Sequence, residues 1–283
     1  MLIGLALVAL AAVAGRLSAV HPPRSPATAS RPLALSPARV GPAPGLAGLR
    51  ARRELLRLVA RGLPVFCGGT RGNAVAFTFD DGPGVYTHYA VRKLTAAHER
   101  ATFFVVGKSI TAWPRWVRRE AQIAALGDHT LHHVDLAVLP PALVYDEIAG
   151  ARAMIERRSG QAVVLFRPPY GARDATVDRV VRRLGLVDVM WSVDSGDSLG
   201  ANWVQIIRNV ARGLRPGAII EMHENRGQTI RALDTLLGLL RRRHLHSVSV
   251  TSLLASDPPS GAQLRRGEAG CGVPARTRRR GAE

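Results

Sequence analysis

From residue 73 onward, short apolar runs alternate with longer stretches whose apolar residues recur at helical spacing. The apolar runs that predict strands cover residues 74–79, 102–106, 163–166, 187–191, 218–222 and 247–250. The helical patterns that separate them cover residues 86–98, 112–126, 173–184, 201–214 and 227–243. Alternation of this kind predicts an α/β fold with a parallel sheet and covering helices.

The number of these units predicts a barrel. About six or seven strand–helix units within roughly 180 residues favour a distorted or incomplete (β/α) barrel of about seven parallel strands. The 283-residue chain is long enough for one such domain with tails. Clusters of polar residues follow several apolar runs, at the strand ends where barrel active sites are built.

The flanking segments differ in composition from this domain, which we expect to span residues 73–255. Residues 1–20 begin with the apolar run MLIGLALVALAAVA and predict a signal peptide or an N-terminal membrane anchor. Residues 21–48 are rich in Pro and Ala and predict a linker. Residues 49–72 predict a basic amphipathic lead-in that packs on the domain. We expect the basic tail, residues 256–283, to be mostly disordered.

The charge balance is strongly basic. The chain has 39 Lys and Arg against 21 Asp and Glu, a formal net charge of +18, and only Lys93 and Lys108 are lysines. Such a field attracts polyanions, including an acidic cell-wall polymer or anionic lipid. Nucleic acid is a disfavoured partner, because the arginines lie in amphipathic stretches and tails without a base-reading motif. An arginine-rich codon usage would give the same composition.

Two cysteines bracket the predicted domain. Cys67 precedes the first strand and Cys271 lies in the tail, so neither belongs to a Cys-x-x-Cys metal or redox pair. In an exported protein a single disulfide could join the two ends, and two unrelated thiols are the alternative.

The first two polar clusters carry ligand chemistry. Asp80 and Asp81 end the run TFDDGP, where adjacent carboxylates persist most easily beside a cation, although a plain turn after a strand is the other interpretation. The run DHTLHH then supplies His129 with either His132 or His133. One carboxylate and two imidazoles with an open position describe a catalytic zinc site, although a lone His pair is more often incidental.

Three later clusters also follow predicted strands. Arg167 opens the run RPPYG and could hold a carboxylate ionised. The run WSVDSGD adds Asp194 and Asp197, and the run IIEMH ends in His223, a residue able to protonate a leaving amine near neutral pH. Each cluster is a weak signal, and their shared position at strand ends makes them strong together.

These five motifs, in this order, resemble the polysaccharide deacetylase family, whose NodB-type homology domain occurs in peptidoglycan and chitin deacetylases and acetylxylan esterases. The resemblance covers about residues 73–252, and TFDDGP followed by HTxxH and RxPY is a specific combination. It implies a NodB-type barrel, a metal-dependent hydrolase, and a glycan polymer as partner and substrate.

The resemblance also implies a role for each matching residue. Those that resemble the metal ligands are Asp81, His129 and His133. By the same resemblance, Asp80 would be the general base and Arg167 the residue that orients it. The Tyr170 main-chain amide would be the oxyanion donor, and His223 the general acid. Asp197, or failing that Asp194, would tune the acid, while Trp191 and Tyr170 would line the substrate pocket.

Three positions depart from the family pattern. Glu221 stands where the family usually has an aliphatic residue in the slot for the acetyl methyl, so it is also a substrate-contact candidate. Ser198 replaces an aromatic residue, and residues 123–126 replace the usual Gly-His-Glu stretch. The departures bear on the substrate and leave the metal triad intact.

The sequence therefore predicts an extracytoplasmic enzyme, secreted or anchored at the membrane, that removes N-acetyl groups from peptidoglycan. Chitooligosaccharides and acetylxylan are alternative substrates, and a catalytically silent wall-binding module is the alternative class, with Glu221 its best support. The triad suits Zn²⁺ and tolerates Co²⁺, Ni²⁺ or Mn²⁺. The oligomeric state is left open.

Overall fold

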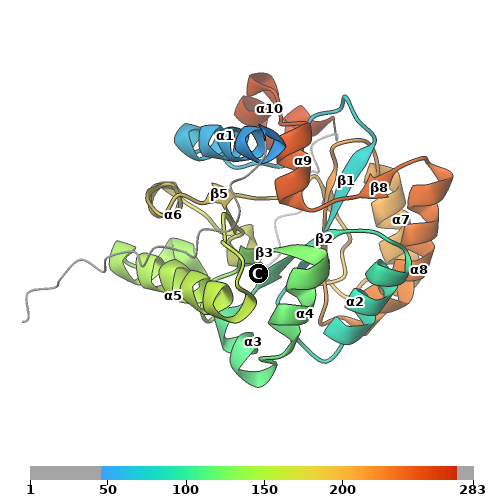
Figure 1. Cartoon of the computed structure of the whole chain (residues 1–283), viewed down its shortest axis with the longest axis horizontal. Helices are drawn as coiled ribbons and strands as arrows, with labels where there is room; N and C mark the ends of the chain where they lie inside the picture. The colour runs from blue at the N-terminus through green and yellow to red at the C-terminus, as the bar shows by residue number, and fades with distance from the viewer. Residues whose placement is uncertain (1–45, 273–283) are drawn as a thin grey trace, which may run out of the picture. The chain divides into compact units, whose positions relative to one another are not determined.

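The computed structural model describes residues 46–272 and contains one parallel sheet (Figure 1). Its strands are β1 (Ala74–Asp80), β2 (Ala101–Val105), β3 (Ala124–Asp128), β4 (Leu165–Phe166), β5 (Val187–Asp188), β6 (Val193–Asp194), β7 (Ile219–His223) and β8 (His246–Ser247). Seven strands run in the order β5-β4-β3-β2-β1-β7-β6, and every pair is parallel, while β8 pairs with the start of β1. These strands curl into a half-barrel, which confirms the predicted fold class.

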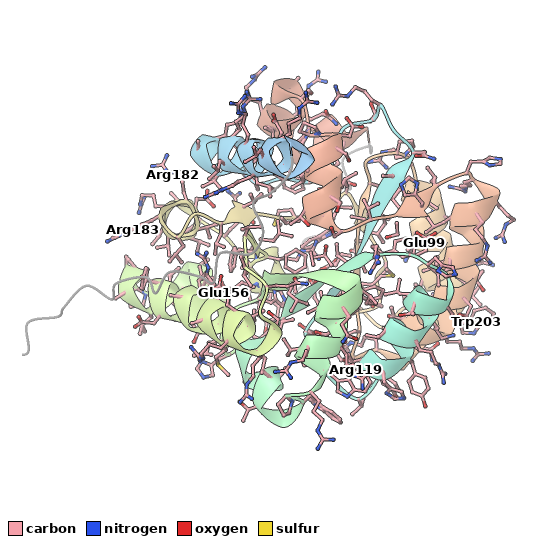
Figure 2. The ribbon with its side chains drawn as sticks, in the orientation of Figure 1. Glu99, Arg119, Glu156, Arg182, Arg183 and Trp203 are labelled. Carbon is pink, nitrogen blue, oxygen red and sulfur yellow. A yellow bond between two sulfur atoms is a disulfide. The ribbon has the colours of Figure 1, made fainter. Side chains whose placement is uncertain are left out.

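Helices cover the outer face of the sheet in an order that follows the strands. These helices are α2 (Thr87–Ala96), α3 (Gly107–Ala112), α4 (Trp116–Ile123), α5 (Pro141–Ser159), α6 (Ala175–Arg183), α7 (Trp203–Gly213) and α8 (Gly227–Arg242). Neighbours in the series α6, α5, α4, α2, α8, α7 pack against one another. Much of the basic charge lies on their solvent side: Arg182 and Arg183 on α6 and Arg119 on α4 are exposed (Figure 2).

The strand period of two separates the core from the site. On β1, Phe77 and Phe79 are fully buried in the core shared with the outer helices. Ala76 belongs instead to the core inside the half-barrel, and Thr78 and Asp80 follow it at the same spacing. The inner face therefore changes from apolar to polar toward the carboxyl end of the strand.

The opposite end of the half-barrel is closed by helices from both ends of the domain (Figure 1). Helix α1 (Leu46–Arg61) packs against α9 (Val250–Ser256) and β5, and α9 packs against β1. Leu58, Leu253 and Leu264 are buried with the inner core. The amphipathic segment expected at residues 49–72 therefore packs on the domain through helix α1.

The tail was expected to be mostly disordered, but the part of it that the structure describes is folded at residues 261–271. They form α10 (Gly261–Arg266) and the 3₁₀ helix η3 (Gly267–Cys271). Ser260 caps α10, and Gln263 donates a hydrogen bond to the Gly68 carbonyl at 3.1 Å. Polar contacts, buried Leu264 and the bond to Cys271 order a segment whose composition predicts disorder.

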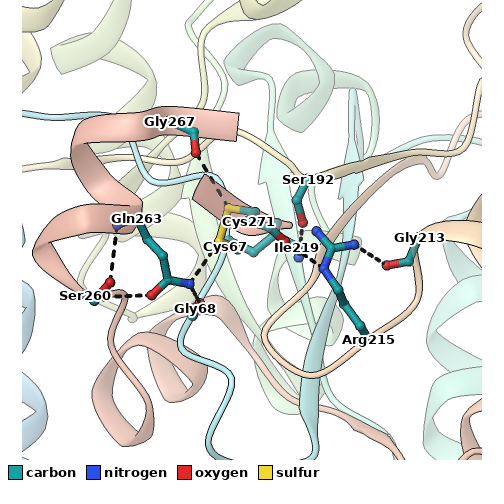
Figure 3. Close-up of a disulfide and its surroundings, with 10 residues drawn as sticks. All are labelled: Cys67, Gly68, Ser192, Gly213, Arg215, Ile219, Ser260, Gln263, Gly267 and Cys271. Atoms are coloured by element: carbon teal, nitrogen blue, oxygen red, sulfur yellow. Dashed lines mark hydrogen bonds between the residues drawn. A yellow bond between two sulfur atoms is a disulfide. The ribbon is translucent and has the colours of Figure 1, made fainter. Parts of the chain in front are cut away.

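A disulfide joins Cys67 to Cys271 across 204 residues, with 6.0 Å between the two Cα atoms (Figure 3). Arg215 also donates to the Cys271 carbonyl at 2.7 Å. The two cysteines are therefore paired and are not unrelated thiols. Such a bond indicates an oxidising, extracytoplasmic compartment. Among residues 46–272 no helix has the length and apolar character needed to cross a membrane; the predicted signal peptide or anchor and the linker up to residue 45 lie outside them.

The helix predicted for residues 112–126 extends three residues too far and crosses the break between α3 and α4. The chain forms α3, then α4 up to Ile123, and β3 begins at Ala124. Residues 124–128 pair with β2 along its whole length, and a Cβ at Gly127 would stand 2.4 Å from the Phe104 ring. Alanine-rich composition favours a helix locally, but pairing with a buried strand overrides it. Helix α5 and strand β6 were also missed.

Candidate active site

The polar motifs meet at the carboxyl ends of the parallel strands. Strands β1, β2 and β7 lie side by side, and the register aligns Asp80 with Phe104 on one side and His223 on the other. Because all strands point the same way, their ends share one rim. The five motifs, which are far apart in the sequence, therefore converge.

The two adjacent aspartates separate because the chain turns sharply between them. Asp80 keeps its strand position and is 1% exposed, whereas Asp81 has a φ of 74°, a left-handed conformation that Asp tolerates better than most residues. A Cβ on Gly82 would stand 1.4 Å from a Glu224 oxygen, so only glycine fits after the pair. The turn gives each carboxylate its own set of partners.

Asp81, His129 and His133 form a three-residue group that suits a metal ion. The Asp81 Oδ1 atom lies 3.0 Å from His133 Nε2 and 3.6 Å from His129 Nε2, and their three potential ligand atoms lie within 4.8 Å of one another. One carboxylate and two imidazoles match the donor set of a catalytic zinc site with an open position. Burial by itself would raise the pKa of Asp81. The combined effect of His133, His129 and His223 is larger and lowers this pKa below its ordinary value, so the carboxylate stays ionised.

His129 is oriented for this role. Its Nδ1 atom lies 2.7 Å from the Arg167 carbonyl oxygen, which leaves Nε2 directed at Asp81. Metal-binding histidines commonly use their second nitrogen in this way. Burial lowers the pKa of His129 despite the nearby carboxylates Asp80 and Asp81, which favours the neutral imidazole that a metal requires.

The backbone decides between the two candidate partners of His129. His133 has a φ of 60°, and its main-chain N–H donates to Thr130 Oγ1 at 2.9 Å, so its ring turns inward. His132 points outward, with its Nδ1 atom 2.7 Å from Glu147 and its side chain 57% exposed. The Tyr170 hydroxyl lies 3.2 Å from the Nδ1 atom of His133. The structure thus brings His133, and not His132, into the group.

Arg167 is fully buried and holds Asp80. Its Nη1 atom donates to Asp80 Oδ1 and to Thr78 Oγ1, both at 2.8 Å, and its other donors bind main-chain carbonyls of residues 189 and 190. The guanidinium also lies over the Phe104 ring, 4.1 Å from its centre. A buried ion pair held by this many bonds fixes the direction of the carboxylate.

His223 faces Asp80 from β7 and is held from behind by Asp197. Asp197 Oδ1 lies 2.7 Å from His223 Nδ1, and Oδ2 accepts the His223 main-chain N–H at 2.7 Å and the Thr229 hydroxyl. Burial lowers the pKa of His223, but Asp197 and then Asp80 raise it to about 9. The imidazole is therefore protonated near neutral pH, with Nε2 free to donate.

The remaining predicted residues lie around this centre. Tyr170 has a φ of 60° and a side chain that is 72% exposed, with its ring edge-on to His133. Trp191 lies with its ring centre 5.5 Å from the Arg167 guanidinium carbon. Asp194 pairs in register with Glu221 and accepts the Gly196 N–H at 2.6 Å. Of the two aspartates, Asp197 is the one that holds His223.

Sequence reasoning missed a pair of buried acids behind the TFDDGP turn. Glu120 on α4 and Glu224 after β7 are both 0% exposed, and Thr87 donates to Glu224 and accepts the Gly84 N–H. Burial raises the pKa of Glu120 to about 8, and burial together with Glu120 raises that of Glu224 well above its usual value. In the sequence, Glu224 could have been suspected only because it directly follows His223, and no pattern pointed to Glu120.

The family model for polysaccharide deacetylase matches residues 68–189. The chitooligosaccharide deacetylase of Bradyrhizobium sp. (strain ANU 289) is 35% identical over 192 residues, which are 62% of this chain and 87% of that protein. The peptidoglycan-N-acetylglucosamine deacetylase PgdA of Listeria monocytogenes is 31% identical over 191 residues, and the match covers 67% of this chain but only 40% of that protein.

A solved structure with the same fold belongs to a protein described as catalytically inactive. A CE4 family pseudoenzyme from Bacillus anthracis superposes with a TM-score of 0.64 at 26% identity, covering 68% of each chain. The fold alone therefore does not separate active from inactive relatives, and the side chains at the rim must do so.

Proposed function

This chain belongs to the polysaccharide deacetylase family, and from that premise we propose that it is an active, metal-dependent hydrolase that removes N-acetyl groups from peptidoglycan. One observation carries the proposal: an ion-paired Asp80 and an aspartate-held His223 both lie beside the Asp81–His129–His133 group. A silent module has no need to hold a base, an acid and a ligand set in one place.

Asp81, His129 and His133 would hold the metal, for which Zn²⁺ is the first candidate and Co²⁺, Ni²⁺ or Mn²⁺ are alternatives. When bound, such an ion polarises a carbonyl oxygen and lowers the pKa of a water molecule. The ionised state of Asp81 and the neutral state of His129 suit those roles.

Asp80 would act as the general base. It takes a proton from the attacking water, whose oxygen then forms a bond to the acyl carbonyl carbon. Arg167 keeps the carboxylate directed into the site through the 2.8 Å bond to Oδ1, which leaves Oδ2 available for the proton. A positioned base of this kind contributes about 10²–10⁴ in rate.

His223 would act as the general acid. The carbon–nitrogen bond breaks as Nε2 donates its proton to the departing amine, and Asp197 stabilises the imidazolium beforehand. The Tyr170 main-chain amide would stabilise the oxyanion of the tetrahedral intermediate. Trp191 would line the pocket, and Asp194 would add negative charge near the acid.

Peptidoglycan is our first substrate for three reasons. The disulfide is typical of domains outside the cytoplasm, the net charge of +18 suits an anionic wall, and curated relatives include a peptidoglycan deacetylase. Chitooligosaccharides are the alternative, because a relative at 35% identity carries that activity in its name. Acetylxylan would require hydrolysis of an ester instead of an amide.

Acetate release tests the proposal. Metal-loaded protein is incubated with peptidoglycan, N-acetylglucosamine oligomers and acetylxylan, beside a chelated sample and the Asp80→Asn variant. We expect release from peptidoglycan that both chelation and Asp80→Asn reduce by at least about 10²-fold. Release from the oligomers or xylan alone would reassign the substrate. No release from any polymer by protein that binds the metal would favour the silent wall-binding module.

A further inference from the structure

Glu221 is a carboxyl group in the interior of the half-barrel. It lies in the middle of β7, two residues before His223 and two after Ile219, and is 8% exposed. The period of two along β7 places it on the inner face with both of them. Its register partners are Thr78 on β1 and Asp194 on β6.

Its position brings Glu221 to the reacting groups. One oxygen of Glu221, one oxygen of Asp80 and one ring nitrogen of His223 all lie within 4.8 Å of one another. A carbonyl carbon attacked by a water held at Asp80, with its nitrogen protonated by His223, must lie between those two groups. The third substituent of that carbon, the one that distinguishes one acyl group from another, then lies against Glu221.

The surroundings make Glu221 a hydrogen-bond donor. Burial, and then repulsion by Asp80, raises the pKa of Glu221 to about 8, although His223 and Arg167 oppose the shift. A neutral carboxylic acid offers one O–H group and retains an acceptor oxygen. A methyl group packed against it leaves both without a partner, and an unpaired buried polar group is unfavourable.

The same three residues would also suit a cation, but their partners argue against one. Arg167 already donates to Asp80, and the raised pKa of His223 keeps its imidazole protonated, a form that cannot bind a metal. The pocket is therefore better matched to a neutral polar group than to a second ion.

We propose that Glu221 selects acyl groups that carry a hydroxyl on the carbon next to the carbonyl, so that N-glycolyl amino sugars are the preferred substrates of this site. The proposal rests on the proposed hydrolase function and deepens it. The substrate hydroxyl would pair with the Glu221 carboxyl in place of the methyl of an acetyl group. A site built to bond a substrate hydroxyl discriminates against the analogue that lacks it.

Paired substrates test the selectivity. N-glycolyl and N-acetyl glucosamine oligomers of equal length are given to metal-loaded wild type, Glu221→Leu and Glu221→Gln, and kcat/KM is measured for both. We expect the wild type to favour the glycolyl oligomer by about tenfold, the value of one good hydrogen bond. Glu221→Leu should reverse the preference, whereas Glu221→Gln, of nearly the same shape and still polar, should keep it. A wild type that prefers the acetyl oligomer, or a ratio that Glu221→Leu leaves unchanged, would overturn the proposal.

A binding measurement separates this proposal from the proposed function. Glycolate and acetate are titrated calorimetrically into metal-loaded wild type and Glu221→Leu, which needs no turnover. Glycolate can also chelate a metal through its hydroxyl, so only the part of its advantage that Glu221→Leu removes counts in favour. If no oligomer is hydrolysed, the proposed function fails, and the glycolate-to-acetate ratio still decides whether Glu221 recognises the hydroxyl. Equal ratios in the two proteins would refute that recognition.

Discussion

The two ends of the half-barrel differ in composition: one is apolar and the other is rich in ionisable groups. At the amino ends of the strands, α1, α9 and α10 cover an apolar core, and the Cys67–Cys271 disulfide ties the segment between α1 and β1 to the end of η3. At the carboxyl ends, buried ionisable groups crowd together. Of the six non-glycine residues with positive φ values among residues 46–272, four lie there, namely Asp81, Thr130, His133 and Tyr170, whereas His98 and His244 precede β2 and β8.

This difference shows how the fold divides its tasks. Strained backbone and buried charge lower stability and persist only where surrounding structure holds them. The carboxyl end accepts both in order to aim its side chains, and the amino end supplies packing and a covalent link. We therefore expect the loss of a site residue at the carboxyl end to impair chemistry without a matching loss of stability, and changes at the amino end to lower stability.

His133→Ala should abolish function with little loss of stability. Removing one of three metal ligands should lower metal affinity and reduce the deacetylation rate by about 10³-fold or more, because the ion supplies several kcal/mol of transition-state stabilisation. Metal content by elemental analysis and acetate release measure the two effects. His132→Ala, which removes the neighbouring exposed imidazole, is the matched control and should leave both near wild type. Equal losses in the two variants would contradict the assignment of His133.

Removing the disulfide should have the reverse effect. The double variant Cys67→Ser with Cys271→Ser frees a loop of 204 residues in the unfolded chain and should lower the free energy of unfolding by about 2–5 kcal/mol. Denaturant unfolding measures this change. At a temperature where the variant remains folded, its kcat should match the wild type. A large fall in kcat with unchanged stability would break the comparison between the two ends.

Glu221→Gln should stabilise the protein, and more so at higher pH. The folded pKa of Glu221, about 8, exceeds the ordinary value of 4.5, so the wild type loses stability as pH rises from 4.5 through 8. Glutamine does not titrate. The variant should therefore gain about 3–4 kcal/mol relative to wild type between pH 5 and pH 8 in metal-free protein. A difference that stays constant across this range would show that Glu221 ionises without penalty.

His223 should contribute a smaller pH dependence of its own. Its folded pKa, about 9, lies above the ordinary 6.5, so its stabilisation is complete below pH 6.5 and is lost as pH rises through 9. We expect metal-free protein to lose about 2–3 kcal/mol over that window. Asp197→Asn removes the main partner of His223 and should flatten this part of the curve. An unchanged slope in the variant would mean that Asp197 does not hold the proton on His223.

The sequence predicted the frame of the molecule because periodicity and turn chemistry are local. Alternating apolar runs predicted the parallel strands, and the polar residues after them predicted where the site lies. Prediction failed at Ala124, where local composition favours a helix and pairing with β2 imposes a strand. It also failed at residues 261–271, which a few long-range contacts order.

The candidate site was predictable as a set of residues but not as an arrangement. Spacing alone could not choose between His132 and His133, and the positive φ at His133 decides it. The resemblance left Asp197 and Asp194 open, and only the tertiary structure puts Asp197 on His223. The roles assigned to these residues remain predictions for the variants above.

What the sequence by itself determined is the family, the fold class and the residue types that carry the chemistry, because these follow from patterns within short windows. The tertiary structure alone decided the pairing of Cys67 with Cys271, the burial of Glu120 against Glu224, and the placing of Glu221 between base and acid. Each of those depends on the distance between residues far apart in the chain, which is fixed only when the sheet closes and the two ends of the domain pack together.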